Sequence, residues 1–468
     1  MGRRRVGGPR GDLLRGRQKG GLKEAFDAAV VAEIEALVGP GAVDGLDFEA
    51  IETAARRRAL TVAARAVEQR LNADGSDHRG PTFPCDCGTA ARYAGRRPKT
   101  FTTALGDLML GRAYYYCDAC ESGFCPRDRA LGLQDASLSP AVTRMVGLAA
   151  AMVSFAESSE LMRELGGVPV DAKQVERTAE ALGREIAQDE RTGGEPSPPP
   201  APTMSLGLDG TGVPMRASEL QGREGKQPDG SAKTREVKLV TVWTAEARDD
   251  DGTPVRDAGS VTYSAAIESA ASRDTDEEVS EFAQRTAREA RRRGFDAAAR
   301  RAVLGDGALW IWNLADEQFP GALQIVDLFH VKHYLSDVAK DIYGAKSALG
   351  AQWATQRHDE LDEGQIDAVL AALGLHAQAN DEARKGLDYL TRNRHRMRYP
   401  DFRAQGLCTS SGVVEAGCKV AIGTRLKRAG MHWTVAGADA IIALRCCKLS
   451  GRFEDFWERR AAAPAGAR

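Results

Sequence analysis

The sequence predicts an α+β protein of several domains. Short β-branched runs between residues 205 and 326 alternate with helical periodicity, which is typical of a mixed α/β sheet. The stretches 23–73, 138–190 and 330–396 carry the helical period alone. Five of the nine cysteines fall between residues 85 and 125 and mark a compact module there. At about 150 residues per domain, the 468 residues allow about three domains.

The N-terminal half is predicted to hold helices on both sides of the cysteine module. A Gly-Pro-Gly break at 39–41 divides the first helical stretch in two. Four prolines among residues 196–200 cannot continue a helix and favour an extended spacer, so we place the main domain boundary there. The predicted regions are a basic flexible arm at 1–22, helices at 23–80, the cysteine module at 81–130, further helices at 131–192 and a Pro-rich linker at 193–203.

The cysteine module has the ligand spacing of a tetrahedral zinc ribbon, with two cysteine pairs about 30 residues apart and strands between them. The predicted strands span Arg96–Leu110 and Gly111–Tyr116. The first pair reads Cys-x-Cys instead of Cys-x-x-Cys, so Cys125 or His78 is an alternative ligand, and small buried cysteines are the alternative to a metal site. The predicted zinc ligands are Cys85, Cys87, Cys117 and Cys120.

The composition and the other cysteines exclude several classes of protein. The net charge of −2 excludes a uniformly cationic nucleic-acid coat, and no run of about 18 apolar residues occurs, which excludes a membrane span. No apolar segment follows the basic arm, so we do not interpret it as a secretory signal. The odd cysteine count then favours a reducing compartment. The cysteines interpreted as core residues are Cys408, Cys418, Cys446 and Cys447.

The C-terminal half is predicted to form the mixed sheet and the helices that cover it. An amphipathic helix is expected over Glu277–Arg293, helix from His330 to about Arg396, and a last helix from Gly412. Trp310 and Trp312 are interpreted as core residues. The predicted strands are Ser205–Leu208, Glu236–Trp243, Ser260–Ser264, Ala302–Leu304 and Leu323–Val326.

Three carboxylates stand in positions that favour metal-dependent chemistry. Asp209 and Asp306 each follow a predicted strand and precede a glycine, which lets a backbone or a ligand approach closely. Glu415 lies on the last predicted helix. Oxygen ligands of this kind suit Mg²⁺ or Mn²⁺, and two such ions can clamp the attacking and leaving oxygens of a phosphoryl displacement. The alternative for each aspartate is an ordinary Asp-Gly turn.

Longer motifs around these acids resemble a known family, the bacterial insertion-sequence transposases of the Kra type, which are DDE enzymes with a ribonuclease-H-like core. The resemblance extends from about residue 85 to about residue 450. The motifs are Leu208–Pro214, Gly305–Trp312, Ile325–Val331, Ser411–Lys419 and Gly430–Trp433. The resemblance implies a ribonuclease-H-like mixed α/β catalytic core at 204–334 and 406–450, an all-α insertion at 335–405 and a C-terminal tail at 451–468.

The resemblance also implies an activity. Asp209, Asp306 and Glu415 match the catalytic triad and would bind two Mg²⁺ or Mn²⁺ ions for phosphodiester hydrolysis and strand transfer. The implied partners are double-stranded DNA, as terminal inverted repeats and as target, and further copies of the chain in a homodimer or larger homo-oligomer. The helices at 23–80 and the zinc module would recognise the repeats, in the bacterial cytoplasm and in association with the nucleoid. A captured transposase that acts as a DNA-binding regulator and a structure-specific nuclease of the same fold are the alternatives.

Other residues are assigned to the surroundings of the triad. Asp327 and His330 match the Asp-x-x-His element of Mutator-like relatives, and His330 either lines the site or caps the following helix. Lys419 lies four residues after Glu415 and either contacts a phosphate or forms an ordinary helix ion pair.

Positive charge is concentrated in three runs, at 285–301, 392–398 and 425–432. Each run either contacts DNA phosphates or is a solvated helix face. The individual residues predicted to contact DNA are Arg96, Arg97, Lys99, Arg425, Lys427 and Arg428.

Overall fold

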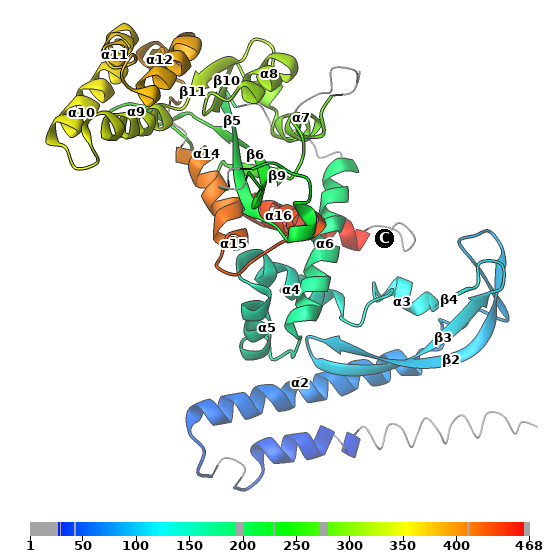
Figure 1. Ribbon diagram of the computed structural model, residues 1–468. Coiled ribbons are helices and arrows are strands. Elements are labelled where there is room, and N and C mark those ends of the chain that lie inside the picture. The colour runs from blue at the N-terminus through cyan, green and yellow to red at the C-terminus, as the bar shows by residue number, and fades with distance from the viewer. Residues whose placement is uncertain are drawn as a thin grey trace, which may run out of the picture. The chain divides into compact units, whose positions relative to one another are not determined.

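The computed structural model describes residues 27, 28, 30–41, 44–192, 201–225, 227, 230–270, 279–409 and 412–462, except the side chains of residues 413–415. Within these residues the protein has an α+β fold, as predicted (Figure 1). The basic arm at 1–22 and residues 193–200 of the Pro-rich linker lie outside the described residues. The chain divides into two compact units, one of residues 1–149, 156–175 and 459–468 and one of residues 150–155 and 176–458, and each is described by itself.

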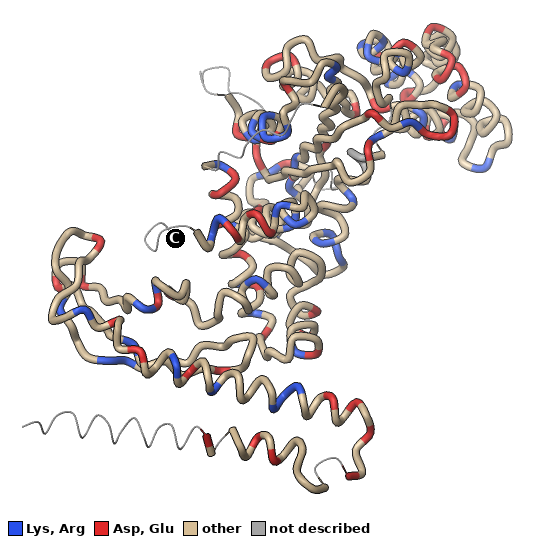
Figure 2. Tube along the Cα trace, turned by 180° about the vertical axis from the view of Figure 1, so that it is seen from behind, with Lys and Arg blue, Asp and Glu red and all other residues tan. Residues whose placement is uncertain are grey.

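The first unit begins with two helices, as the sequence predicts. A helix over residues 30–38 is followed by α2 (Phe48–Ala73). Near the end of α2, the Asn72 side chain donates to the Met109 carbonyl at 2.9 Å and accepts from the Gly111 amide at 2.8 Å, so this helix is fixed to the following sheet. Positive and negative segments both occur along α2 (Figure 2), so the helix does not present a uniformly basic surface.

An antiparallel sheet with the order β1-β2-β3-β4 contains the cysteine module. Its strands are β1 (Thr82–Pro84), β2 (Ala90–Thr103), β3 (Gly106–Cys117) and β4 (Ser122–Phe124). The prediction of one strand over Arg96–Leu110 is wrong, because the chain reverses between Thr103 and Gly106. Gly106 adopts a φ of +115° there, a conformation that favours glycine. The preceding Ala-Leu pair carries no turn signal, which explains why the sequence does not reveal the hairpin.

Helices follow the sheet, which confirms the prediction for residues 138–190. They are α3 (Pro126–Ala130), α4 (Pro140–Met152), α5 (Phe155–Glu164) and α6 (Ala172–Thr192). The division between the compact units falls within this helical region and not in the Pro-rich linker. Gly183 of α6 explains the difference, because it packs on α16 (Val435–Leu449) so closely that a Cβ would lie 2.0 Å from the Ala440 carbonyl oxygen. Most of α6 therefore belongs to the second unit.

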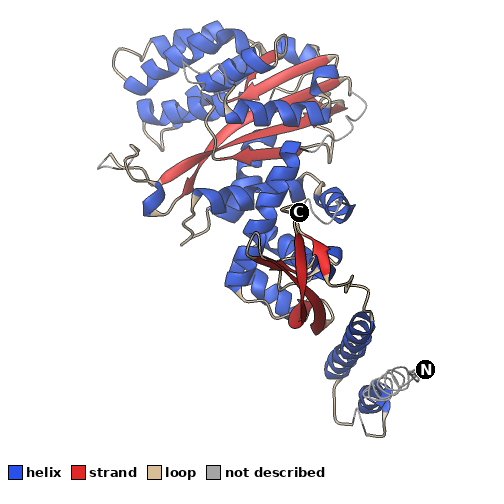
Figure 3. Ribbon diagram, turned by 90° about the vertical axis from the view of Figure 1, so that its right-hand side faces the viewer, coloured by secondary structure: helices blue, strands red, loops and turns tan. Residues whose placement is uncertain are grey.

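The second unit is built on a five-stranded sheet with the order β11-β10-β5-β6-β9 (Figure 3). Its strands are β5 (Thr203–Pro214), β6 (Thr234–Thr244), β9 (Thr262–Ala266), β10 (Arg300–Gly305) and β11 (Leu323–Val326). β6 is antiparallel to both of its neighbours, whereas β5, β10 and β11 are parallel to one another. A separate two-stranded ladder is formed by β7 (Ala247–Arg248) and β8 (Pro254–Val255). All five predicted strands are confirmed, although β5 continues six residues beyond its predicted end.

Helices account for most of the remaining second unit. Between β9 and the end of the helical insertion they are α7 (Glu281–Arg293), α8 (Leu309–Gln318), α9 (Leu328–Tyr343), α10 (Ala348–Asp362), α11 (Ile366–Gly374), α12 (Asp381–Asn393) and α13 (Tyr399–Ala404). The helices that follow the insertion are α14 (Gly412–Gly417), a π-helical segment (Cys418–Gly423), α15 (Thr424–Leu426), α16 and α17 (Phe453–Ala462). The segment 335–405 contains helices and no strand among its residues, as predicted. The predicted C-terminal tail at 451–468 is helical over α17, because Phe453 and Phe456 are buried there.

The helices pack on both faces of the sheet. On one face, Leu206 and Val240 share a buried core with Phe282 of α7. On the other face, Gly417 at the end of α14 lies so close to β6 that a Cβ would be 2.9 Å from the Leu239 side chain. Trp312 of α8 is also buried in the core, as predicted.

Part of the arginine-rich run at 285–301 belongs to a buried ion-pair network, which neither expectation for the run anticipates, whereas Arg291 and Arg300 are exposed. Arg285 forms an ion pair with Glu268 at 2.6 Å. Glu289 is 1% exposed and accepts ion pairs from Arg292 at 3.0 Å and from Arg452 at 2.9 Å. Burial opposes ionisation of Glu289, but Arg452 and Arg292 hold its pKa below the usual value. These arginines hold the unit together and are not available to DNA.

Candidate functional site

The three aspartates of the predicted site lie in one row at the carboxyl edge of the parallel strands. The register pairs Leu304 of β10 with Gly207 of β5, and Gly305 of β10 with Val326 of β11. Continuing the same register brings Asp306 opposite Asp209 on one side and opposite Asp327 on the other. Asp209 is not at a strand end as predicted, because β5 continues through antiparallel pairing with β6 up to Pro214. The parallel pairing nevertheless ends just before it.

Asp209 is half-buried beside a thiol and a second carboxylate. Its Oδ1 accepts from the Gly210 amide at 2.7 Å, and the Cys418 thiol donates to its carboxylate. The pKa of Asp209 is raised to about 6, and burial is the main cause. The Asp306 charge also raises this pKa, whereas the hydrogen bonds from Cys418 and Gly210 and the nearby His330 lower it. Asp209 and Asp306 therefore lie close enough to repel each other, and a cation between them would relieve that repulsion.

Gly210 has a packing role that the sequence does not reveal. A Cβ at Gly210 would lie 2.5 Å from the Glu236 carboxylate, and one at Gly212 would lie 2.7 Å from the Thr234 hydroxyl. These two glycines therefore accommodate side chains of the neighbouring strand β6. At Gly210, the group that approaches the backbone closely is therefore the Glu236 side chain.

Asp306 forms a turn, and its charge raises the pKa of Asp209. Its Oδ1 accepts from the Ala308 amide at 2.9 Å, which is the Asp-Gly turn weighed as the alternative. The Tyr389 hydroxyl, from α12 in the helical insertion, donates to the Asp306 carbonyl oxygen at 2.7 Å. Gly307 has a φ of +94°, and a Cβ there would lie 2.5 Å from the Tyr389 ring. Tyr389 thus holds the backbone of the turn that carries Asp306.

We expect Gly307→Ala to test this contact. The added methyl group introduces backbone strain and a clash with Tyr389, so the unfolding free energy should fall by about 2–4 kcal/mol. Gly451→Ala is the matched control, because Gly451 has a φ of +73° but open space around it, and it should cost only about 1–2 kcal/mol. Tyr389→Ala in the Gly307→Ala background should recover part of the difference. Urea unfolding followed by tryptophan fluorescence measures all of these values, and equal losses for the two glycines would contradict the contact.

The sequence left two roles open for His330, which were to line the site or to cap the following helix. In the structure, Asp327 caps the helix and His330 lies at the site. The buried Asp327 carboxylate accepts from the His330 amide at 3.0 Å and is the N-cap of α9. His330 itself is exposed, and its ring lies 6.5 Å from the Tyr389 ring. The expectation that His330 caps the helix is wrong, because the preceding aspartate supplies that bond. His330 instead lies at the rim of the site, near enough to favour ionisation of Asp209.

The backbone of Glu415 belongs to α14, which packs on the sheet face that carries Asp209. Leu239, against which Gly417 packs, is the register partner of Asp209. The side chain of Glu415 lies outside the described residues. The helix changes to π geometry at Cys418, so the regular four-residue spacing that aligned Lys419 with Glu415 ends there, and Lys419 is exposed.

The sequence did not identify Cys418 and Tyr389 as neighbours of the site. Cys418 was interpreted as a core residue, and it is buried as predicted, but its thiol also contacts Asp209. Tyr389 lies more than 80 residues from Asp306 in the chain, and no motif in the sequence marks it. Only the fold brings either residue to the aspartates.

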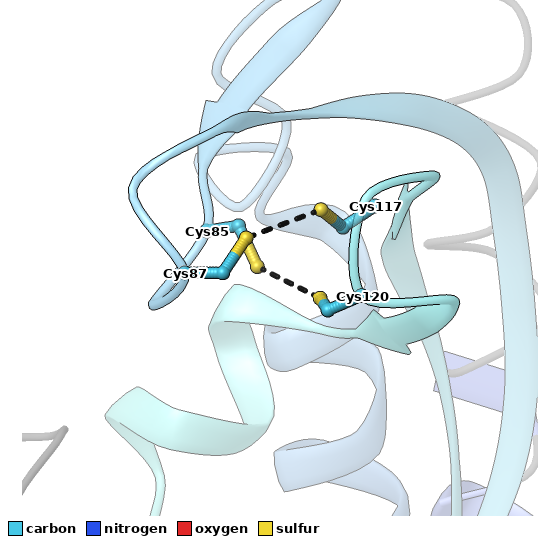
Figure 4. Close-up of side chains that lie close together, drawn as sticks. All are labelled: Cys85, Cys87, Cys117 and Cys120. Carbon is cyan, nitrogen blue, oxygen red and sulfur yellow. Dashed lines mark hydrogen bonds between the residues drawn. The ribbon is translucent and has the colours of Figure 1, made fainter.

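The cysteines of the first unit form a cluster that can hold a metal such as zinc. Figure 4 shows the two pairs facing each other, with Cys85 Sγ 3.5 Å from Cys120 Sγ and Cys87 Sγ 3.5 Å from Cys117 Sγ. Their four ligand atoms all lie within 4.8 Å of one another, which suits tetrahedral coordination. Among the described residues, no other set of three or more possible ligands is gathered so closely. The carboxylates of Asp209, Asp306 and Asp327 therefore do not form such a set.

Local bonds explain how the short Cys-x-Cys pair reaches the cluster. Gly88 has a φ of +84° and donates to the Cys85 carbonyl at 3.0 Å, which folds the chain into a tight turn. A hydrogen bond from the Thr89 hydroxyl is the largest influence that lowers the pKa of Cys117, to about 6. Cys125 is buried outside the cluster, and the His78 ring packs on Tyr93 at 4.4 Å. The four clustered cysteines therefore complete a tetrahedral site without Cys125 or His78.

One predicted DNA contact is wrong. Arg425 is 0% exposed, donates to the Ala150 carbonyl at 2.9 Å, and its guanidinium packs over the rings of both Phe155 and Trp433. Its guanidinium therefore cannot reach a phosphate. Arg428 is exposed, and Lys427 is exposed with its ammonium donating to the Thr211 hydroxyl, two residues beyond Asp209.

Arg425→Ala is accordingly expected to affect stability. Loss of this buried side chain and of its hydrogen bond should lower the unfolding free energy by about 2–5 kcal/mol. The exposed Arg428→Ala should change it by less than about 0.5 kcal/mol. Urea unfolding of both variants makes the comparison, and equal stabilities would contradict the buried position of Arg425.

The predicted contacts near the cysteines differ among themselves. Arg96 is held by Asp77 at 3.0 Å and by the Gly111 carbonyl. Arg97 and Lys99 follow it on β2, with Arg97 exposed and Lys99 half-buried. No helix in the described part of the chain combines the length and the apolar character that crossing a bilayer requires. Comparison with protein-family models gives no match, and comparison with curated proteins gives none either.

Proposed function

We propose that the protein is a DNA transposase of the DDE class, which cleaves a phosphodiester at the ends of an insertion sequence and joins the freed 3′-OH to target DNA. The observation that carries the proposal is the placement of Asp209 and Asp306 just beyond the last paired residues of the parallel strands β5 and β10, with Asp209 on the sheet face that α14 covers. α14 contains Glu415. These three elements supply the carboxylates that the resemblance to Kra-type transposases assigns to the triad.

The strand arrangement supports a ribonuclease-H-like core. Numbered along the chain, such a core has the strand order 3-2-1-4-5, and only its second strand runs antiparallel to the others. The order β9-β6-β5-β10-β11, with β6 as the antiparallel strand, fits this arrangement. The helices between residues 335 and 405 would then be the all-α insertion.

The donor set fits Mg²⁺ or Mn²⁺. Asp209 and Asp306 supply hard oxygen ligands, and their mutual repulsion in a half-buried site is what a divalent cation would remove. Asp209, Asp306 and Glu415 would hold the ions. Such ions, when bound, lower the pKa of a water molecule and stabilise the leaving oxygen of an in-line phosphoryl displacement.

The chain's other groups then have defined tasks. The Cys418 thiol orients the Asp209 carboxylate through its hydrogen bond. Asp327 caps α9 and thereby places His330 at the rim, where its ring can hydrogen-bond a water or a phosphate oxygen. Lys427, beside Thr211, would contact the phosphate next to the scissile one.

A combined cleavage and joining assay tests the proposal. Duplexes that carry the DNA flanking the gene, labelled at the 5′ end of the strand whose 3′-OH is freed, are incubated with the full chain, a supercoiled target plasmid and Mg²⁺ or Mn²⁺. We expect labelled nicked ends and labelled plasmid, both of which disappear with a chelator. Nicked ends without joined product would favour a structure-specific nuclease of the same fold. DNA binding with neither product would favour a captured transposase that acts as a regulator.

A further inference from the structure

The first unit contains a groove of about 660 Å³ beside the cysteine cluster. β2, β3 and β4 form its floor, and the turns that carry the cysteines form one wall. The groove contains more basic than acidic side chains. The basic ones are Arg97, Lys99, Arg112 and Arg129, and the acidic ones are Asp86, Asp128 and Asp135.

Arg97 is held flat on an aromatic ring in this groove. Its guanidinium carbon lies 3.5 Å from the centre of the Tyr114 ring. Tyr114 in turn lies over Gly123 of β4, where a Cβ would be 1.9 Å from the tyrosine oxygen, so only glycine permits this stack. A guanidinium fixed in this way loses little conformational entropy when it binds a ligand.

The basic side chains of the groove are not all neutralised. Arg112 is 7% exposed and is paired with Asp128, and Arg129 is paired with Asp86 at 2.6 Å. Within the described residues, Arg97 and Lys99 have no carboxylate at ion-pair distance. Arg97 is also the direct cross-strand partner of Arg112, and like charges in that position are destabilising. Because Asp128 already compensates the Arg112 charge, the charges left for an anion in the groove are those of Arg97 and Lys99.

We propose that this groove binds a phosphate of the DNA backbone between Arg97 and Lys99. The inference rests on the proposed function, which makes DNA the partner, and adds a defined contact site for it. A planar guanidinium offers two parallel N–H donors to a phosphate, and the ammonium of Lys99, two residues along the same strand face, adds a point charge. Because Cys85, Cys87 and Cys120 line the same groove, the metal cluster shapes the site.

Salt-dependent DNA binding tests the site. The probe is a duplex that carries the DNA flanking the gene, and binding is measured at several salt concentrations with metal omitted from the buffer, so that no cleavage occurs. For Arg97→Gln/Lys99→Gln we expect weaker binding at low salt. The slope of log affinity against log salt should become shallower by about 1, because each phosphate contact contributes about 0.9 to it.

Arg92→Gln is the matched control. Arg92 lies on the same strand and over Tyr116, with its guanidinium carbon 5.5 Å from the ring centre, but it is paired with Asp118 at 3.1 Å. Its replacement should leave the slope unchanged. Arg97→Lys keeps the charge but loses the planar fork, so it should weaken binding and keep most of the slope, even if the double variant does not fold.

The outcomes separate this inference from the proposed function. If the folded double variant keeps the affinity and the slope of the wild type, the groove is not a phosphate site, while cleavage by the wild type still supports the transposase. If Arg92→Gln lowers the slope as much as the double variant, the effect is one of general charge and the site is overturned. If the wild type binds no DNA at low salt, the proposed function fails together with the groove.

Discussion

Asp209→Asn and Asp306→Asn are each expected to lower metal-dependent DNA cleavage by roughly 10³-fold or more, which is about 4 kcal/mol of transition-state stabilisation. Each change keeps the size of the side chain but removes a negative oxygen ligand from the edge of the parallel strands, where the charge of Asp306 acts on Asp209. Asparagine at position 209 also removes the repulsion with Asp306, so neither variant should be less stable than the wild type. Glu415→Gln should have the same effect if α14 supplies the third ligand.

Asp316→Asn is the matched control for these variants. Asp316 lies on α8 of the same unit, is exposed and bonds only the Gln324 side chain among the contacts described for it. It should cleave like the wild type. Affinity for the duplex should be similar in all variants when metal is absent, so a loss of product then reports chemistry and not DNA binding. Wild-type cleavage by Asp209→Asn would remove that residue from the site and with it the central observation of the proposal.

The strands of the second unit could be predicted because they are rich in β-branched and apolar residues. Val237, Val240, Thr241 and Val242 fall within Glu236–Trp243, and Leu323–Val326 is mostly apolar and ends at Asp327. The helices that were not predicted include α8, α16 and α17. α16 is buried nearly all round, so it has no polar face to produce a helical period. α8 begins with a run of large apolar residues, which periodicity cannot distinguish from a buried strand.

The candidate site was predictable only in part, for a physical reason. Asp209 and Asp306 follow apolar strands, and the ends of parallel strands meet at one edge, so their proximity could be expected. Whether a charged side chain faces the core or the solvent depends on tertiary packing, and the neighbouring sequence does not show it. Arg425 and Lys427 stand two residues apart in a basic run, and one is fully buried while the other is exposed, because residues two apart lie on opposite sides of a helix. Which of the two turns inward depends on the contact of Arg425 with Phe155 and Trp433, and the sequence does not show that contact.

Cys117→Ser is expected to remove the bound metal and to unfold the cysteine module. Wild-type protein should contain one Zn²⁺ per chain, because four thiolates in tetrahedral reach form a closed structural site. Structural zinc contributes about 10–16 kcal/mol of apparent binding free energy in small modules, far more than this short four-stranded sheet can supply by packing. Cys125→Ser is the matched control, because Cys125 is buried in the same module but lies outside the cluster, so that variant should keep its metal.

The position of the tryptophans allows the unfolding of the module to be followed separately. All six tryptophans lie at or after residue 243, in the second unit, so their fluorescence does not report on the module. Cys117→Ser, or the wild type with a chelator, should therefore lose far-ultraviolet dichroism at a lower temperature while the tryptophan transition stays where it was. Elemental analysis should find less than one Zn²⁺ per chain in the same sample. A metal-free protein that keeps one unchanged transition by both probes would contradict the metal centre, because the remaining contact between the two cysteine turns, such as the hydrogen bond of Thr89 with Cys117, is weak compared with a bound metal.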